Sequence, residues 1–144
     1  MSTLEDRIAQ VVTRFKGGSD REDRYKELIK VGKEMPAYPE EVRLEKFQVK
    51  GCQSQVWLHP TFKEGKLYFS ADSDAILVKG IVGLLAYVYS GATPAEILAD
   101  KAEFLQEIGI REHLSMNRTS GLASMQKQIQ MYAAVFQAMS KGSP

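Results

Sequence analysis

The side chain best suited to chemistry in this 144-residue chain is its single cysteine, Cys52, which lies in a polar segment between two apolar stretches. A lone thiol cannot close a disulfide within the chain, and thiolate zinc and iron–sulfur sites usually need several cysteine ligands. Nucleophilic or redox chemistry with a partner remains open. A purely structural role also remains open, because single cysteines often serve as small buried apolar side chains.

The residues around Cys52 bear on whether its thiol could react. An ordinary thiol is only about 3% ionised at pH 7, and the thiolate is the nucleophile. Lys50 could favour the thiolate electrostatically, and Gly51 would let a large partner approach the sulfur closely. Gln53 and Ser54 carry uncharged donors that could hold a sulfur anion or the backbone of a partner. The same two residues would be equally ordinary in a solvated loop.

Cysteine hydrolase chemistry is the obvious enzymatic alternative, and it needs a histidine base. The chain has two histidines, His59 and His113. His59 falls in a predicted strand that leads away from the cysteine turn. His113 precedes a predicted helix, where a structural hydrogen bond is a common role. The sequence therefore disfavours a cysteine hydrolase.

Three short runs in the middle of the chain alternate between apolar and polar residues, as half-buried strands do. They cover residues 47–50, 55–59 and 66–71, and short turns that contain glycine separate them. We predict a three-stranded antiparallel sheet, with Cys52 in the connection between its first two strands.

In the sequence before and after these three runs, apolar residues recur every three or four positions, which predicts helices. The helices are expected near residues 3–16, 20–35, 75–89, 94–98 and 117–139. No strand–helix–strand alternation is present to build a parallel sheet. The expected fold is therefore α+β, a single domain over the whole chain with helices packed on one side of an antiparallel sheet.

The composition is that of an ordinary globular protein, with 19 basic and 18 acidic residues. This balance gives no bulk charge to attract nucleic acid or an anionic membrane. The longest apolar stretch, residues 75–89, is too short to span a bilayer, and the N-terminus has no apolar signal core. A single cysteine fits a reducing compartment. We therefore expect a soluble cytoplasmic protein with neither nucleic-acid nor membrane partners.

The segment around the cysteine, residues 49–58 with the sequence VKGCQSQVWL, resembles the signature of the SufE family of sulfur-acceptor proteins. Further segments resemble the family in the same order, from about residue 20 to the end of the last helix. One departure is Phe47, which stands where a polar residue, often asparagine, is expected. The matching segments are residues 24–29 with Gly32, Lys33 and Pro36, residues 72–75 and 78–80, residues 91–98, and residues 113–115 with Arg118, Gly121 and Leu122.

The resemblance implies the fold of the IscU scaffold proteins and a single SufE-like domain, residues 1–144, with its core at about residues 20–140. SufE-like proteins accept sulfane sulfur from a pyridoxal-phosphate cysteine desulfurase, SufS-like or CsdA-like, as a persulfide on their cysteine. They stimulate that desulfurase and hand the sulfur to a SufBCD-type scaffold for iron–sulfur cluster assembly. The resemblance thus implies a sulfur-transfer accessory protein rather than a stand-alone enzyme, monomeric or homodimeric, with no cofactor and no metal of its own.

With this resemblance, Cys52 is expected to be the persulfide acceptor. Its thiolate attacks the terminal sulfur of the donor persulfide, and the donor cysteine leaves as a thiolate. Because a persulfide needs protection from reductants, we expect the turn to hold Cys52 toward apolar walls at rest, formed by Val49, Val56 and Trp57, and to move outward on docking. Two alternatives stay open, a desulfurase activator that carries no sulfur and a thiol redox sensor that acts through Cys52.

Six further residues are expected to support the site or contact the partner. Arg118 is expected to pair with Asp72 or Asp74, or to contact the sulfur donor. Alternatively, Arg118 forms an ordinary surface ion pair while Asp74 and Asn117 cap helices. Lys79 lies in an apolar helix, so its ammonium must reach solvent or a carboxylate. The six residues are Gly51, Gln53, Ser54, Asp74, Lys79 and Arg118.

Overall fold

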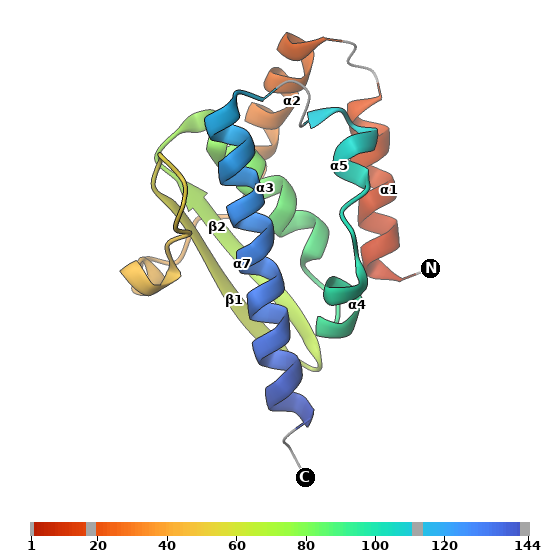
Figure 1. Cartoon of the computed structure of the whole chain (residues 1–144), viewed down its shortest axis with the longest axis vertical. Coiled ribbons are helices and arrows are strands. Elements are labelled where there is room, and N and C mark those ends of the chain that lie inside the picture. The colour runs from red at the N-terminus through yellow and green to blue at the C-terminus, as the bar shows by residue number, and fades with distance from the viewer. Residues whose placement is uncertain (1, 17–19, 111–113, 142–144) are drawn as a thin grey trace.

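The computed structural model describes residues 2–16, 20–110 and 114–141, and it has the α+β architecture that the sequence predicts (Figure 1). A β-hairpin lies against a layer of helices with α3 at its centre. The elements are α1 (Thr3–Phe15), α2 (Arg21–Glu34), the 3-10 turns η1 (Glu40–Val42) and η2 (Glu45–Phe47), the strands β1 (Val56–Lys63) and β2 (Lys66–Ser73), and the helices α3 (Ile76–Tyr89), α4 (Pro94–Ala99), α5 (Phe104–Glu107) and α7 (Met116–Lys141).

β1 and β2 pair antiparallel, and their register ends at the pair Lys63–Lys66. The two residues between them, Glu64 and Gly65, have positive φ angles of 52° and 79°. Positive φ at both central residues is typical of the two-residue hairpin turn that matches strand twist. The turn lies where the sequence predicts it.

The prediction of three strands is wrong, because the sheet has two strands in the described part of the chain. Residues 47–50 contribute only one bridge, between Gln48 and Trp57, with the Val49 N–H donating to the Val56 carbonyl at 2.8 Å. The first residue of the predicted strand, Phe47, belongs to the turn η2, and the cysteine turn begins directly after the predicted strand. Four residues between two turns leave room for a bridge but not for a ladder.

One face of the hairpin forms part of the core and carries the buried residues Leu58, Leu67 and Ala71. α3 packs on this face, and α7 packs on it as well, with the Tyr132 hydroxyl donating to the Leu58 carbonyl at 3.0 Å. The helices therefore lie on one side of the sheet, as predicted.

The connection between α2 and β1 covers the opposite face of the hairpin (Figure 1). There the Arg43 guanidinium lies 4.7 Å from the centre of the Trp57 ring, and the Phe47 ring meets the His59 ring edge-on at 4.5 Å. Phe47, the departure from the family pattern, thus packs on the sheet against His59.

α3 is apolar on all sides and is correspondingly buried over most of its length. α2 crosses it where Gly32 faces Gly80. A Cβ added to Gly32 would lie 3.1 Å from the Gly80 nitrogen, and one added to Gly80 would overlap the Leu28 carbonyl. The two helix backbones are therefore in direct contact, which fixes where the start of α3 lies.

None of the helices in residues 2–16, 20–110 and 114–141 is both long and apolar enough to cross a lipid bilayer.

Candidate functional site

Cys52 lies in the turn between Gln48, which forms a bridge with Trp57, and the start of β1. Its side chain is half-buried. Gly51 has a φ of +92°, a left-handed conformation that a residue with a side chain rarely adopts. The predicted turn is thus present at Gly51, and the approach of a partner at this residue stays a prediction. The tight backbone directs the sulfur toward α7.

The cysteine turn rests on α7 at two small residues. The Cys52 Sγ–H donates to the Gly121 carbonyl at 3.7 Å, and a Cβ added to Gly121 would lie 3.4 Å from Sγ. A Cβ added to Gly51 would lie 2.5 Å from the Ser124 hydroxyl oxygen. The missing side chain of Gly51 is therefore necessary for this close approach, whereas a Cβ on Gly121 would be in contact with the sulfur.

Beside Cys52 lies an open cleft of about 390 Å³ between α3 and α7, whose lining includes Gln53 and Ser54. Its deep part is apolar and is formed by Leu77, Ile81 and Met125, which are all buried. These residues replace the predicted walls, since Val49, Val56 and Trp57 do not line the cleft. The sheet explains the difference, because it turns Val56 into the core and Trp57 to the opposite face.

The electrostatics of the site favour the protonated thiol. Burial raises the pKa of the Cys52 thiol above its ordinary value. Lys50, which could have favoured the thiolate, pairs instead with Glu45, its Nζ 3.5 Å from a carboxylate oxygen. At rest Cys52 is therefore a neutral and weakly nucleophilic side chain.

The raised pKa predicts how the folded chain reacts with iodoacetamide. The rate of Cys52 alkylation should rise with pH with a midpoint above about 8.5, the value of an unperturbed thiol, because only the thiolate reacts. The same chain in urea should show the ordinary midpoint. A folded-state midpoint at or below the urea value would contradict the burial argument. By linkage, the contribution of Cys52 to the free energy of unfolding should be constant below about pH 8.5 and should fall as pH rises toward the folded-state pKa.

The far end of the cysteine turn is fixed at Gln55 by the junction between β2 and α3. The Asp74 carboxylate accepts the Gln55 N–H at 3.0 Å, and the Gln55 carbonyl accepts the Ser73 hydroxyl at 2.8 Å. Asp74 does not cap α3, whose N-cap residue is Ala75 without a side-chain bond, so the helix-cap alternative is wrong. Asp74 supports the site from the end of the turn.

Replacing Asp74 by alanine should loosen the turn. The variant loses one partly exposed hydrogen bond to a carboxylate, worth about 1 kcal/mol. If the turn opens before Cys52 reacts, alkylation at pH 7 should be up to about fivefold faster. Asp74→Asn is the matched control because its side-chain oxygen can still accept the Gln55 N–H. Equal alkylation rates for Asp74→Ala and the unchanged chain would show that this bond does not restrain the turn.

Asp72 organises a charged cluster on the outer side of the hairpin. Its carboxylate lies 2.9 Å from the Arg43 guanidinium and 3.6 Å from the Lys79 ammonium. Lys79 thus pairs with a carboxylate, which is one of the two predicted environments of its ammonium group, the other being solvent. It does not line the Cys52 cleft. The predicted pairing of Arg118 with Asp72 or Asp74 is wrong. Arg43 was missed, because nothing local in the sequence joins it to Asp72.

Arg118 lines the cleft near the start of α7 and is exposed. Among the described residues its guanidinium has no hydrogen bond or ion pair, so the surface ion pair is wrong as well. Its backbone N–H donates to the Ser115 hydroxyl at 3.3 Å, which makes Ser115 rather than Asn117 the capping side chain. Arg118 and Cys52 therefore line the same cleft.

His59, the histidine in the described part of the chain, gives no support to hydrolase chemistry. The His59 ring packs against Phe47 on the outer face of the hairpin, and burial lowers its pKa. His113 lies outside the described residues. In the part of the chain that is described, no three histidine, cysteine or acidic side chains gather closely enough to hold a metal ion.

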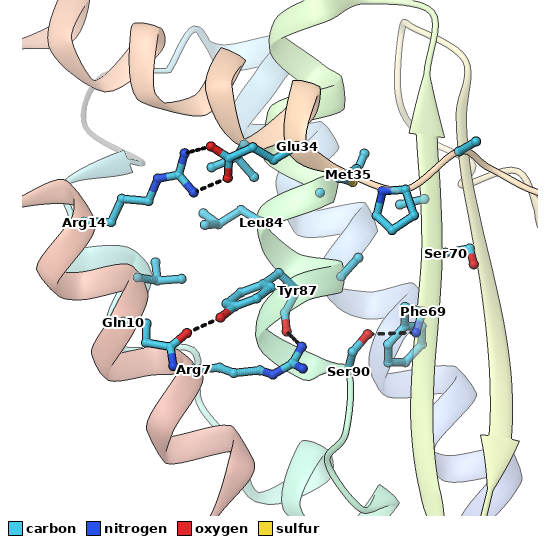
Figure 2. A pocket seen from close by; sticks show the side chains of 17 residues that line it. Arg7, Gln10, Arg14, Glu34, Met35, Phe69, Ser70, Leu84, Tyr87 and Ser90 are labelled. Atoms are coloured by element: carbon cyan, nitrogen blue, oxygen red, sulfur yellow. Dashed lines mark hydrogen bonds and ion pairs between the residues drawn. The ribbon is translucent and has the colours of Figure 1, made fainter.

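A second cavity, of about 510 Å³, opens between α1, α3 and β2 (Figure 2). Its polar groups are largely paired with one another. Arg14 binds Glu34 through two bonds of 2.8 Å, and the Tyr87 hydroxyl bonds Gln10 while the Tyr87 carbonyl accepts from Arg7 (Figure 2). Its lining contains neither a thiol nor an imidazole and shares no residue with the Cys52 cleft.

Comparisons with known proteins identify a family for the chain. The family model for SufE, an Fe-S metabolism associated domain, matches residues 9–133. A SufE-like protein of Synechocystis is 35% identical over 94% of this chain and 86% of its own length. The sulfur acceptor protein CsdE of Escherichia coli is 37% identical over 75% of each chain. A solution structure of a hypothetical protein from Thermus thermophilus superposes with a TM-score of 0.73 and 25% identity, over 89% of this chain and 93% of the other.

Proposed function

Because the chain belongs to the SufE family, we propose that it accepts sulfur as a persulfide on Cys52 and delivers it for iron–sulfur cluster assembly. The observation that carries the proposal is the position of the chain's single cysteine. It is half-buried in a tight turn and lies at the edge of an open cleft. A thiol in this position is shielded at rest and can still be reached by a docking partner.

The transfer step is a displacement at sulfur. The donor is a persulfide on a cysteine desulfurase, whose pyridoxal phosphate releases the sulfur from free cysteine. The Cys52 thiolate attacks the terminal sulfur, a new S–S bond forms on Cys52, and the donor S–S bond breaks with the donor cysteine leaving as a thiolate. The proton lost from Cys52 balances the charge of that thiolate. No oxidant, metal or cofactor on this chain takes part.

The turn is proposed to move outward during this step, because the Cys52 Sγ–H donates to the Gly121 carbonyl and this contact is given up when the sulfur meets its donor. Its two ends are fixed, at Val49 by the bond to the Val56 carbonyl and at Gln55 by Asp74. The residues between these anchors include Gly51, whose backbone freedom suits a hinge. Movement is thus confined to the few residues that carry the thiol.

The supporting residues have distinct proposed roles. Gln53 and Ser54 line the cleft and offer uncharged donors to the sulfur or to the backbone of the partner. Arg118, exposed and with no described ion-pair partner, is proposed to meet an acidic group of the desulfurase. Lys79 acts more remotely, through Asp72 at the end of β2.

The proposed partners are a SufS-like or CsdA-like desulfurase, which the protein stimulates, and a SufBCD-type scaffold that receives the sulfur. The single domain, with no metal or cofactor of its own, works in the cytoplasm, where a thiol stays reduced.

Intact-protein mass spectrometry tests the proposal. The chain is incubated with a desulfurase, pyridoxal phosphate and cysteine, and then measured with and without a reductant. The expected result is a mass increase of one sulfur atom on Cys52 that the reductant removes. An unmodified chain that still stimulates the desulfurase would instead identify an activator. Modification only under oxidants would identify a redox sensor.

A further inference from the structure

Gly121 is an unusual residue for its position in the chain. It is buried in the second turn of α7, where glycine is less favourable than alanine by about 1 kcal/mol. The helix is therefore locally weaker than it could be. A Cβ at Gly121 would lie 3.4 Å from the Cys52 sulfur, which is contact distance, so a side chain that extends beyond Cβ would compete with the sulfur for its place against the helix backbone.

The contact with Gly121 distinguishes the two protonation states of Cys52. A thiol can donate its proton to the Gly121 carbonyl, as it does at 3.7 Å. A thiolate has no proton to donate and would face the negative end of the same carbonyl dipole. The thiol form is therefore favoured in this position, and the thiolate is favoured away from it.

Burial acts in the same direction as this contact, because it raises the pKa of the Cys52 thiol. The part of the cleft contributed by α3, residues 75–78 and 81, is apolar, and the turn itself contributes uncharged Gln53 and Ser54. Arg118 is the charged side chain among the described residues that line the cleft, and it is exposed. Lys50 is paired with Glu45.

We propose that Gly121 is a positioning residue for the sulfur transfer: its bare backbone holds Cys52 as a neutral thiol at rest, so that ionisation of the thiol and outward movement of the turn occur together. The inference rests on Cys52 being the sulfur acceptor. It explains how the thiol stays unreactive toward small electrophiles and becomes nucleophilic when a partner draws the turn away from α7.

The test is the alkylation of Cys52 by iodoacetamide as a function of pH in Gly121→Ala and Gly121→Leu. Leucine extends beyond Cβ into the space of Sγ and should displace the thiol. We expect its alkylation rate at pH 7 to rise about tenfold and its pH midpoint to fall, since a tenfold change in thiolate corresponds to one pKa unit. Alanine, which reaches only contact distance, should give a smaller rise.

Ala123→Leu is the matched control, because it adds the same side chain at an exposed position of the same helix. It should react like the unchanged chain. If Gly121 served only helix packing, Gly121→Ala would stabilise α7 and leave the pH profile unchanged. An unchanged profile in a folded Gly121→Leu, or a shift of equal size in Ala123→Leu, would overturn the proposal. Should Gly121→Leu not fold, as judged by circular dichroism, an unchanged profile for Gly121→Ala would overturn it.

These measurements need no desulfurase, so they are independent of the proposed function. Sulfur loading of the same variants is measured separately by mass spectrometry. The alkylation midpoint could shift stepwise from the unchanged chain through Gly121→Ala to Gly121→Leu while the unchanged chain takes up no sulfur. That result would refute the acceptor role and leave the effect of Gly121 on the thiol intact. Normal loading with a flat pH profile across the series would refute only the role of Gly121.

Discussion

Replacement of Cys52 by serine is expected to abolish sulfur loading while leaving the fold intact. A serine hydroxyl is not ionised near neutral pH and forms no S–S bond with a donor persulfide, so the displacement has no nucleophile. The hydroxyl is close in size to the thiol and can still donate to the Gly121 carbonyl. Radiolabelled sulfur from cysteine, passed through a desulfurase, should therefore not appear on the variant, and thermal unfolding should change little.

Two further variants show whether the position of the thiol matters. Lys50→Ala changes the same turn at an exposed residue that pairs with Glu45 rather than with the sulfur, and it should load normally. Cys52→Ser combined with Ser54→Cys moves the thiol two residues along the turn, away from the Gly121 contact, and should restore little loading. Full sulfur delivery by Cys52→Ser would refute the carrier mechanism. Full stimulation of the desulfurase without loading would separate activation from transfer.

The features that the sequence predicts correctly have causes within a few residues of one another. Thr93 and Glu96 cap α4 reciprocally, with Pro94 in the first turn, as their spacing indicates. The hairpin turn at Glu64 and Gly65 lies where the pattern places it. The prediction of a third strand was wrong because four alternating residues cannot show whether the flanking turns leave room for a ladder of hydrogen bonds.

In the candidate site, too, the features that depend on neighbouring residues were predicted and the contacts between distant residues were not. The motif around Cys52 identifies the reactive residue and its turn, because those residues are contiguous. The contact partners are distant, with Gly121 69 residues away from Cys52 along the chain. Periodicity could assign Met125 to a buried helix face but could not show that this face meets the cysteine turn. Arg43 likewise reaches Asp72 only through the folded connection over the sheet.

Gly80→Ala is expected to be a strongly destabilising substitution in the helix layer. A methyl group at this position would overlap the Leu28 carbonyl of α2. The clash is with backbone, so no change of side-chain rotamer relieves it and the two helices must separate. We expect a loss of about 3 kcal/mol in the free energy of unfolding. At about 2–4 °C per kcal/mol for a chain of this size, Tm should fall by about 6–12 °C.

Gly83→Ala is the matched control, because it lies one turn further along the same helix. Its methyl group would meet the thioether end of Met35, which is flexible and can move. Since alanine also favours helix over glycine, this variant should lose less than about 1 kcal/mol. Equal Tm values for the two variants would show that α2 and α3 are not held by direct backbone contact. Because Ile81, the neighbour of Gly80, lines the cleft, a shifted α3 should also alter the reactivity of Cys52. Loss of stability with unchanged alkylation would therefore mean that α7 alone holds the cysteine turn in place.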